Sequence, residues 1–387
     1  MHDVLIVGGG PVGLFMAALL LQQGLDVRVL EQRTERSTHS RAIGIHPPAL
    51  DALDSVGVSA GLLVQGVQIR RGLARSGGRD VAGLSFATVS AAHPYVLAVP
   101  QERTESALEA RVRELSPAAL IRGVRVDSMH DDGGSVTLNA VRNGGSAFTD
   151  DTAGPAAGPT AGPAAGPPDG QAPPAEYRAE YRARLVLAAD GARSTIRDRL
   201  GIPTTVRDYP DHYVMGDFAD GTADGTTAVL YLEPGGIVES FPLPGNLRRW
   251  VVHTDGPLSQ PTADQLAGLI RERTGAAVDP SRNSMLSAFS VRARLARRLV
   301  QGRVALIGDA AHEISPIGGQ GMNLGWLDAA AFAPIIGAAL EGAPVGRRLR
   351  TFERTRQRAA GRAVWQSHLN MALGRPLPAP VMAARNR

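Results

Sequence analysis

The chain has 387 residues, 43% of them hydrophobic, which is enough to build real cores in one large domain or two smaller ones. It contains no cysteine and no lysine, so disulfides, thiolate metal sites, a P-loop lysine and a Schiff-base lysine are excluded. All 41 basic residues are arginines, and 37 acidic residues leave a formal net charge of +4 without a concentrated basic stripe. These values predict a globular protein that does not bind nucleic acid.

The fold is expected to begin almost at the first residue. The apolar run at 4–7 follows His2 and Asp3 directly, without the basic segment and cleavage site of a signal peptide. The longest apolar stretch, LFMAALLL at 14–21, is too short to span a bilayer. We therefore expect a soluble, cytoplasmic protein with no membrane span.

Residues 3–31 predict a strand, a helix and a second strand. DVLIVG is typical of a buried strand, PVGLFMAALLLQQG of an apolar helix that ends near Gly24, and DVRVLE of another buried strand. Such a unit is a parallel crossover. Further helices are expected at 47–57 and 100–115, with glycine-broken strands between them at 67–99.

The middle of the chain changes character twice. Segments 121–129 and 135–142 predict an antiparallel hairpin around the turn HDDGG. Residues 143–176 follow, in which TAGPAAGP occurs twice in tandem at 152–167, and nothing in this stretch can form a core. We expect a disordered Gly/Pro/Ala insert in a surface loop.

Order resumes at 183–201 with a strand, a turn and a short helix. Alternating strands broken by proline and glycine fill 203–292 and predict an antiparallel sheet, interrupted by a helix at 262–275. An α/β pattern returns at 302–312, and a helical tail follows at 347–374. The predicted fold class is α/β, with a discontinuous first domain (1–70, 98–200, 293–345), a sheet-rich second domain (71–97, 201–292) and a helical C-terminal segment (346–387).

A glycine motif marks the first candidate site. Gly8, Gly10 and Gly13 form G-x-G-x-x-G between the first strand and the first helix, with Pro11 and Val12 inside the motif. This spacing lets the backbone approach a pyrophosphate at a helix N-terminus. Glu31 ends the next strand, where an acid binds a ribose diol, and Gln32 follows it. The pattern predicts dinucleotide binding but does not separate NAD from FAD.

The second candidate site is GDAAHEISPIGGQGMN at 308–323. A carboxylate follows a buried strand, and glycines then open a helix whose free N–H groups can stabilise a reduced flavin ring while Asp309 accepts from ribityl hydroxyls. NAD has no ribityl chain, so the site favours FAD. Its candidate residues are Gly308, Asp309, Pro316, Gly319, Gly321, Met322 and Asn323.

Three motifs together resemble one family, the FAD-dependent aromatic hydroxylases with the p-hydroxybenzoate hydroxylase fold, or class A flavoprotein monooxygenases. They are VGGGPVGL with LEQR, AADGARSTIR, and GDAAHEISPIGGQGMNLG. The resemblance implies a Rossmann-type FAD-binding domain interleaved with an antiparallel substrate domain. It further implies that Asp190 and Gly191 serve FAD and NAD(P)H binding, and that Arg41 and Gln101 lie near the pyrophosphate and ribityl chain.

The same resemblance implies the reaction. NADH or NADPH would reduce FAD transiently, O2 would form a flavin C4a-hydroperoxide, and its terminal oxygen would hydroxylate an electron-rich aromatic molecule without a metal. The chain is most similar to hydroxylases of polyketide-derived or phenolic rings. An FAD-dependent reductase or dehydrogenase and a non-catalytic flavin-binding sensor remain alternatives, whereas a flavin halogenase is excluded by the missing lysine. The oligomeric state is left open.

Substrate contacts are chosen by residue type alone. The candidates in the sheet-rich domain are Tyr213, Met215, Tyr231 and Phe241, and Phe218 and Trp250 are further candidates by type. Most of these side chains are expected to belong to the core. No catalytic residue can be assigned, because a general base is identified by its reach to the substrate. His312 is interpreted as a hydrogen-bonding residue, and the G-x-S-x-G at 57–61 as chance, since it follows a helix pattern.

Overall fold

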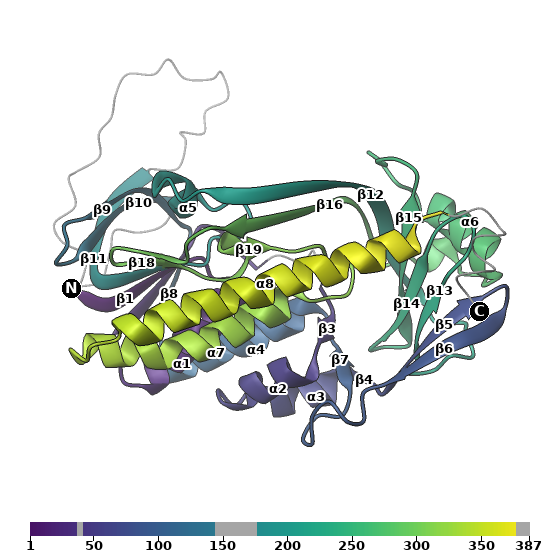
Figure 1. Ribbon diagram of the computed structural model, residues 1–387, viewed down its shortest axis with the longest axis horizontal. Helices are drawn as coiled ribbons and strands as arrows, with labels where there is room; N and C mark the ends of the chain where they lie inside the picture. The colour runs from purple at the N-terminus through teal and green to yellow at the C-terminus, as the bar shows by residue number, and fades with distance from the viewer. Residues whose placement is uncertain (37–41, 144–175, 377–387) are drawn as a thin grey trace, which may run out of the picture.

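The computed structural model describes residues 1–36, 42–143 and 176–376 (Figure 1). Arg41 and nearly all of the predicted insert at 143–176 therefore lie outside the described residues. The described chain forms two eight-stranded sheets and one three-stranded sheet, with helices around them.

The first sheet is built on parallel strands, with β11 and β2 on either side of β1 in the order β17-β18-β11-β1-β2-β8. Its strands are β1 (His2–Val7), β2 (Val27–Glu31), β8 (Leu120–Arg122), β9 (Val124–Asp131), β10 (Val136–Asn143), β11 (Glu176–Ala188), β17 (Val300–Gln301) and β18 (Val304–Leu306). Val4, Leu5 and Ile6 are fully buried. Strands so buried must be covered on both faces, as parallel sheets are.

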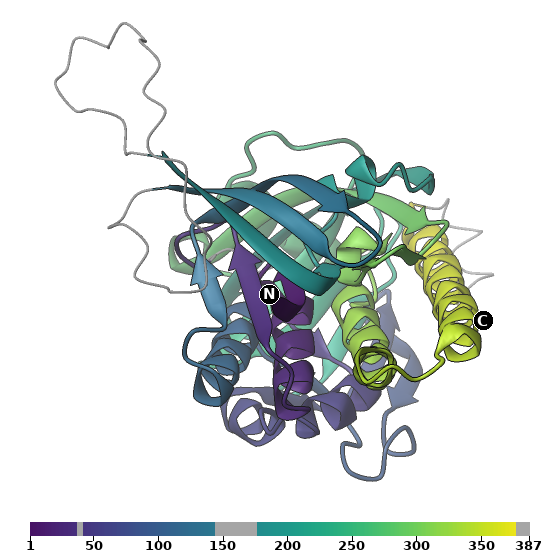
Figure 2. The ribbon, with the colours of Figure 1, turned by 90° about the vertical axis from the view of Figure 1, so that its left-hand side faces the viewer.

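Three helices cover one face of these strands, and the antiparallel ribbon β9–β10–β11 lies over the other (Figure 2). The helices are α1 (Pro11–Gln22), α4 (Gln101–Leu115) and α7 (Gly321–Leu340). α1 is apolar around most of its surface, which suits a helix enclosed between a sheet and two other helices. Trp326 of α7 donates a hydrogen bond from Nε1 to the carbonyl of Pro11 (3.0 Å) and so fixes α7 against the start of α1.

α7 is the one described helix long and apolar enough to cross a membrane by length and composition. However, 61% of its apolar window is buried inside the protein, between α1, α2 and α8. The packing identifies it as a core helix of the first domain.

The second sheet has the order β19-β16-β12-β15-β14-β13-β5-β6, and only the β13–β5 pair is parallel. Its strands are β5 (Arg71–Ser76), β6 (Arg79–Ser85), β12 (Thr204–Ala219), β13 (Ala228–Tyr231), β14 (Val238–Leu243), β15 (Leu247–Thr254), β16 (Met285–Ala296) and β19 (His312–Glu313). Helix α6 (Ala263–Thr274) packs on one face through Leu266 and Ile270. The other face is turned toward the first domain.

The remaining elements connect the two large sheets. They are β3 (Gly44–Ile45), β4 (Val67–Ile69) and β7 (Val96–Ala98), which form the small sheet, the helices α2 (Pro47–Asp54), α3 (Ser59–Gln65) and α5 (Thr195–Arg199), and the 3-10 turns at Pro280–Arg282 and Gly308–Ala310. α3 was not predicted. The segment predicted as one strand at 121–129 is divided at Gly123 (φ 73°), where the chain leaves β8 and turns into β9.

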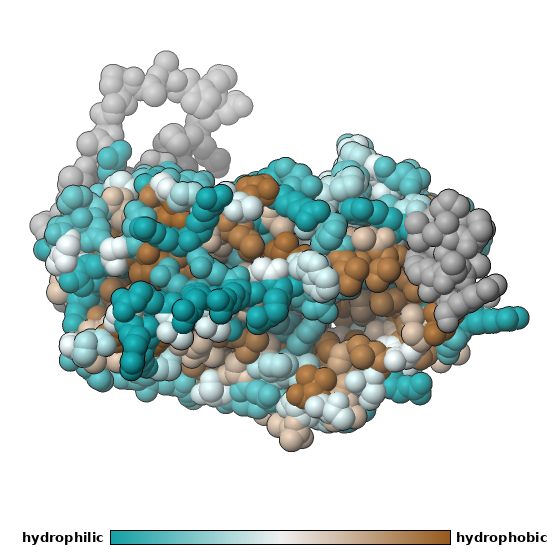
Figure 3. Space-filling model, in the orientation of Figure 1, coloured by the Kyte–Doolittle hydropathy of each residue, from teal (hydrophilic) through white to brown (hydrophobic). Residues whose placement is uncertain are grey.

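The long helix α8 (Gly346–Gly374) joins the two halves of the molecule (Figure 1). Phe352 stacks on Phe332 of α7 with ring centroids 4.6 Å apart, and at the far end the N–H of Ile237 donates to the carbonyl of Gly374 (2.8 Å). The predicted tail helix is present, and its C-terminal half also carries exposed apolar side chains at Trp365 and Leu369. Figure 3 shows apolar surface gathered around this end of α8.

Each of the two large sheets is built from separate parts of the chain. All strands from 204 to 296 belong to the second sheet, together with β5 and β6, whereas β7 joins the small sheet and β19 extends the second sheet from the 308–323 segment. The domain boundaries drawn from the sequence stay a prediction.

Candidate functional site

The three glycines of the first motif differ in their structural surroundings. Gly8 has φ 110°, and a Cβ there would overlap the carbonyl oxygen of Ala189. A Cβ at Gly13 would overlap the carbonyl oxygen of Gly8. By contrast, a Cβ at Gly10 would meet nothing within 4 Å. The first and third glycines are therefore required by the packing of the protein itself, whereas Gly10 borders open space.

Gly10 precedes α1, with Pro11 at the first helical position, and both line the main cavity of the protein. No side chain caps this helix, so its first N–H groups remain available to a ligand. The positive end of the helix dipole favours an anionic group at the same place.

Glu31 ends β2 beside the glycine turn. Its Oε2 accepts from the N–H of Gly9 (2.6 Å), and its Oε1 accepts from the N–H (2.9 Å) and Nε (2.8 Å) of Arg33. Burial acts to raise the pKa of Glu31, but the hydrogen bonds from Arg33 and Gly9 outweigh it and hold the pKa below its usual value. The carboxylate is thus ionised and fixed, and it lies in the cavity wall with lone pairs not used by these bonds.

Asp190 and Gly191 follow β11 at the same edge of the sheet. Asp190 Oδ2 accepts from the N–H of Ile196 (3.2 Å), whereas Oδ1 is buried and has no hydrogen-bond partner among the described residues. A buried carboxylate oxygen without a donor is costly. Gly191 has φ 81° and lies, like Asp190, in the cavity wall.

The segment from 308 brings a third part of the sequence to this place. A Cβ at Gly308 would meet Val12 at 3.3 Å, and one at Gly325 would overlap the same side chain. Asp309 therefore stands near the first glycine motif. Asp309 lines the cavity and its side chain is exposed there. Desolvation by the protein packed around it nevertheless raises the pKa of its carboxyl, an effect that the nearby His312 opposes.

His312 holds this segment in place rather than facing the cavity. It is buried, and its Nε2 forms a hydrogen bond with Oδ2 of Asp328 on α7, whose Oδ1 accepts from Nε of Arg356 on α8. The interpretation of His312 as a hydrogen-bonding residue agrees with this arrangement.

The glycine-rich loop and the first residues of α7 line the cavity with Pro316 and Gly319 from the loop and Gly321 and Met322 from the helix. Asn323 lies behind the loop instead. Its Oδ1 accepts from the N–H of His46 (2.8 Å), and its Nδ2 donates to the carbonyls of Gly44 (2.9 Å) and Gly319 (2.7 Å). Through these hydrogen bonds, Asn323 holds the glycine-rich loop in place.

One continuous cavity of about 1680 Å³ collects most of the predicted residues. Those in its wall are Gly8, Gly10, Pro11, Val12, Glu31, Gln32, Gln101, Asp190, Gly191, Gly308, Asp309, Pro316, Gly319, Gly321 and Met322. Gly13 and Asn323 stand behind the wall, and Arg41 lies outside the described residues. His46, which was not predicted, also faces the cavity, and burial lowers its pKa.

The cavity continues to the second sheet, where only some of the predicted substrate-contact residues line its wall. Met215 and Phe241 line it, whereas Tyr213 is buried beside it, stacked on Phe289 with centroids 5.6 Å apart. The structure also places several unpredicted residues in this wall: Leu230, Leu232, Ile237, Glu239, Arg249, Val251 and Phe289. The period-two pattern Ile237, Glu239, Phe241 carried this information, because alternate residues of a strand share a face.

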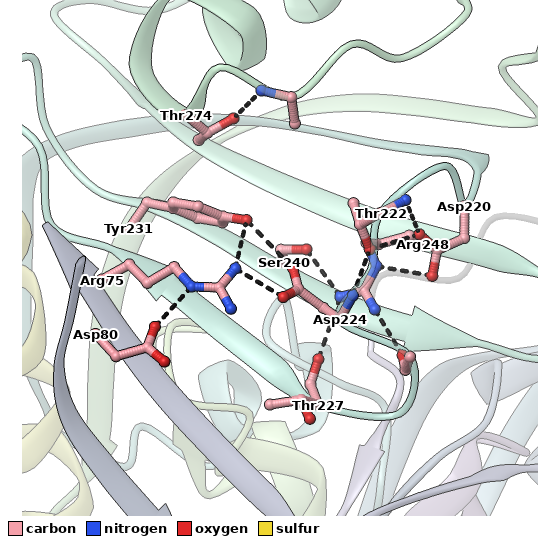
Figure 4. Close-up of polar contacts among 12 residues, drawn as sticks. Arg75, Asp80, Asp220, Thr222, Asp224, Thr227, Tyr231, Ser240, Arg248 and Thr274 are labelled. Carbon is pink, nitrogen blue, oxygen red and sulfur yellow. Dashed lines mark hydrogen bonds and ion pairs between the residues drawn. The ribbon is translucent and has the colours of Figure 1, made fainter. Parts of the chain in front are cut away.

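Tyr231 lies on the opposite face of the second sheet. Figure 4 shows its hydroxyl in a polar network, where it donates to Asp224 (3.4 Å) and accepts from Arg75 (3.5 Å). Phe218 and Trp250 belong to the same core beneath α6. The structure therefore does not bring Tyr231, Phe218 or Trp250 to the cavity.

Two other features lie away from the cavity. Ser59 of the G-x-S-x-G begins α3 after a helix, and its hydroxyl donates to Asp54. Asp51, Asp54 and His93 lie close enough to hold a metal ion, a grouping that the sequence spacing did not indicate. Both ring nitrogens of His93 are already engaged, Nε2 with Asp54 (2.7 Å) and Nδ1 with Tyr95 (3.1 Å).

These residues fit a flavin dinucleotide. The open space at Gly10, the unpartnered oxygen of Asp190, the ionised Glu31 and the carboxylate of Asp309 supply an anion site and hydroxyl acceptors in one cavity. Residues 1–149 and 171–367 match the family described as the FAD binding domain. The chain belongs to this FAD-binding family.

Named relatives of this FAD-binding chain are monooxygenases. It is 30% identical over 395 residues to an anhydrotetracycline monooxygenase of Streptomyces rimosus, covering 97% of this chain and 71% of the relative. It is also 30% identical to a rifampicin monooxygenase of Streptomyces venezuelae, covering 89% and 66%. The crystal structure of a p-nitrophenol 4-monooxygenase of Pseudomonas putida superposes with a TM-score of 0.82 at 26% identity, covering 100% and 92%.

The predicted enzyme class is thereby confirmed, namely an FAD-dependent monooxygenase with NAD(P)H as reductant. These matches support neither the reductase nor the sensor alternative.

Proposed function

We propose that this enzyme hydroxylates an electron-rich aromatic molecule of more than one ring, bound between FAD and the second sheet. The observation that carries the proposal is the single cavity of about 1680 Å³. Sites for one drug-sized ligand measure roughly 300–1,000 Å³, so this cavity has room for a dinucleotide and a second ligand.

The two ends of the cavity differ in chemistry. At the first domain, the cavity wall is formed by glycines, helix N-termini and carboxylates. At the second sheet, the wall is apolar and contains Leu230, Phe241, Val251 and Phe289. The first suits a charged, hydroxyl-rich cofactor, and the second suits a flat apolar ring system. The surface is hollowed beside the C-terminal half of α8, which offers an entrance to the second end (Figure 3).

Within this proposal each motif holds part of FAD. The start of α1 at Gly10 and Pro11 would receive the pyrophosphate, Glu31 the ribose of the AMP half, and Asp309 the ribityl hydroxyls. The loop at Gly319 and Gly321 would present backbone N–H groups to the ring. Bound FAD would supply the redox chemistry, taking electrons from NADH or NADPH and activating O2.

The chain itself would bind the substrate, orient it and exclude water. The relatives' names support a substrate of several rings, since two of them act on anhydrotetracycline and rifampicin, whereas the p-nitrophenol enzyme acts on a single ring. The apolar width of the second sheet favours the larger class.

The test uses purified protein loaded with FAD. A hydroxylated anthraquinone should stimulate consumption of NADH or NADPH and of O2, compared separately for the two nucleotides, and the product should carry one oxygen atom from labelled O2. Label arriving from water, or oxidation without incorporation, would contradict hydroxylation.

A further inference from the structure

A carboxyl group lies in the apolar wall of the cavity. Paired residues of neighbouring strands share a face, and one such row runs across the second sheet through Ala74, Leu230, Glu239, Val251 and Met215. All five line the cavity. Glu239 is the single polar side chain among these five, and the row continues beyond Met215 to Ser287 on β16.

The position of Glu239 on β14 follows from the alternation of the strand. Val238 and Ser240 point to the face covered by α6, while Ile237, Glu239 and Phe241 point to the cavity. Glu239 is 7% exposed. It has no hydrogen-bond or ion-pair partner for its carboxyl among the residues that the structure describes.

The arginines near Glu239 form ion pairs with other carboxylates. On the same face, Arg249 forms two hydrogen bonds with the carboxylate of Asp217 (2.7 and 2.8 Å). Further along, Arg375 makes a similar pair with Asp211, beside His253. Tyr213 is the nearby titratable hydroxyl, and α8 contributes Gln366, Asn370 and Leu373 to the cavity wall, none of which is charged.

Resting on the proposed function, we propose that Glu239 is the catalytic base that binds a phenolic hydroxyl of the substrate and takes its proton. A buried acid without a partner is expensive for the protein and is therefore expected where a ligand completes it. The cavity wall around Glu239 is apolar, so the ring system would lie against Leu230 and Val251 while its hydroxyl meets the carboxylate.

The step is a proton transfer and balances without any other reagent. The O–H bond of the substrate breaks, an O–H bond forms on the Glu239 carboxylate, and the electron pair stays on the phenolate oxygen, which enriches the ring in electrons. Burial raises the pKa of Glu239 to about 7, close to that of a base that works near neutral pH. Asp217 and Asp211 cannot replace it, because their carboxylates are held by arginines.

The experiment measures binding to the FAD-loaded protein with two dyes that differ by one hydroxyl, 2-hydroxyanthraquinone and anthraquinone. Wild-type protein should prefer the hydroxylated dye, and Glu239→Ala should reduce that affinity about 10- to 100-fold while leaving anthraquinone unchanged. Glu341→Gln, which removes an exposed charge remote from the cavity, is the matched control and should behave as wild type.

A spectroscopic readout separates a base from a mere contact. In wild type, formation of the coloured phenolate of the bound dye at neutral pH should be accompanied by protonation of a carboxyl group, seen as a C=O stretching band in the infrared difference spectrum. In Glu239→Gln, which keeps the shape and a hydrogen bond but cannot accept the proton, this band should be absent. A phenolate that forms in wild type without the carboxyl band, or an unchanged preference in Glu239→Ala, would overturn the role of Glu239.

The two proposals fail in different ways. If the wild-type protein binds neither dye, the multi-ring substrate class falls, and the role of Glu239 falls with it. If the wild-type protein binds both dyes equally and hydroxylates the phenolic one, the proposed function stands and the inference about Glu239 alone is wrong.

Discussion

At the scale of single residues, the glycines of the first motif separate what the protein needs from what its ligand needs. Gly8 and Gly13 admit no side chain because their Cβ atoms would overlap backbone oxygens. Gly10 has free space around it. A glycine that the fold does not require, at the open start of a helix, is best explained by a ligand that approaches the backbone there.

Gly10→Ala tests this distinction. We expect its free energy of unfolding to stay within about 1 kcal/mol of wild type, with a loss of FAD affinity of tenfold or more, measured by flavin fluorescence titration. Gly61→Ala on α3, which also meets nothing within 4 Å, is the control and should bind FAD normally. Normal FAD affinity in Gly10→Ala would contradict a pyrophosphate at this position.

Glu239 makes a second prediction, about stability. Its folded pKa is raised to about 7 from an ordinary 4.5, so the folded protein binds this proton more tightly than the unfolded chain does. The contribution of Glu239 to stability must therefore fall as pH rises from about 4.5 to above 7, by up to about 3 kcal/mol.

Urea unfolding of the FAD-free protein at pH 5 and pH 8 measures this effect. Glu239→Gln should be more stable than wild type at pH 8 and similar at pH 5, whereas Glu341→Gln should follow wild type at both. A constant difference between Glu239→Gln and wild type would show that titration of Glu239 does not control stability.

At the scale of elements, three segments meet at one buried carboxylate. Asp328 on α7 accepts hydrogen bonds from His312 on β19 and Arg356 on α8. Burial acts to lower the pKa of His312, but the hydrogen bond and the charge of Asp328 outweigh it and raise the pKa. The cluster thereby fixes the segment that carries Asp309 against the two long helices.

Asp328→Asn should destabilise the protein by about 3–5 kcal/mol, because it leaves buried positive charge unpaired. A histidine whose pKa is raised on folding contributes its full stabilisation at pH values below its unfolded pKa of about 6.5. This contribution is lost as pH rises through the folded pKa. The destabilisation should therefore be larger at pH 5.5 than at pH 8.5 in denaturant unfolding. Asp208→Asn, from the exposed pair with Arg292, should cost less than about 1 kcal/mol.

At the scale of the whole molecule, the cavity lies between the two large sheets, and its walls come from segments far apart in the sequence. A ligand that contacts both sheets binds only the folded chain and stabilises it by mass action. α8 spans the same two parts from the outside, so the cofactor and this helix reinforce one arrangement.

FAD at 100 times its dissociation constant should raise the free energy of unfolding by about 2.7 kcal/mol, and the melting temperature should rise with each further increase in FAD. Differential scanning fluorimetry of the FAD-free protein checks this. NAD at the same concentrations shares the pyrophosphate but lacks the ring and ribityl chain, so it should produce a smaller shift. Equal shifts from NAD would contradict a site built for flavin.

Much of this site could be predicted from local patterns. The glycine spacing at 8–13, the acid at the end of β2 and the carboxylate before the 318–321 loop each depend on residues close together along the chain. The resemblance to the hydroxylase family likewise rests on such motifs. A strand leading into a glycine turn and an apolar helix has few other uses, so sequence alone determined the α/β class and the dinucleotide site.

Only the tertiary structure decided which side chains of the second sheet face the cavity. A strand has two equivalent faces, and its alternation cannot say which one α6 will cover. That choice placed Tyr231 and Trp250 in a core and Glu239 in the cavity. Asn323, which the motif placed at the cofactor, holds the loop through His46 and Gly44, and the sequence could not show this because both partners lie far away along the chain. The sequence determined the end of the cavity at the glycine motifs through contacts between neighbours, and the fold decided its end at the second sheet through contacts between distant strands.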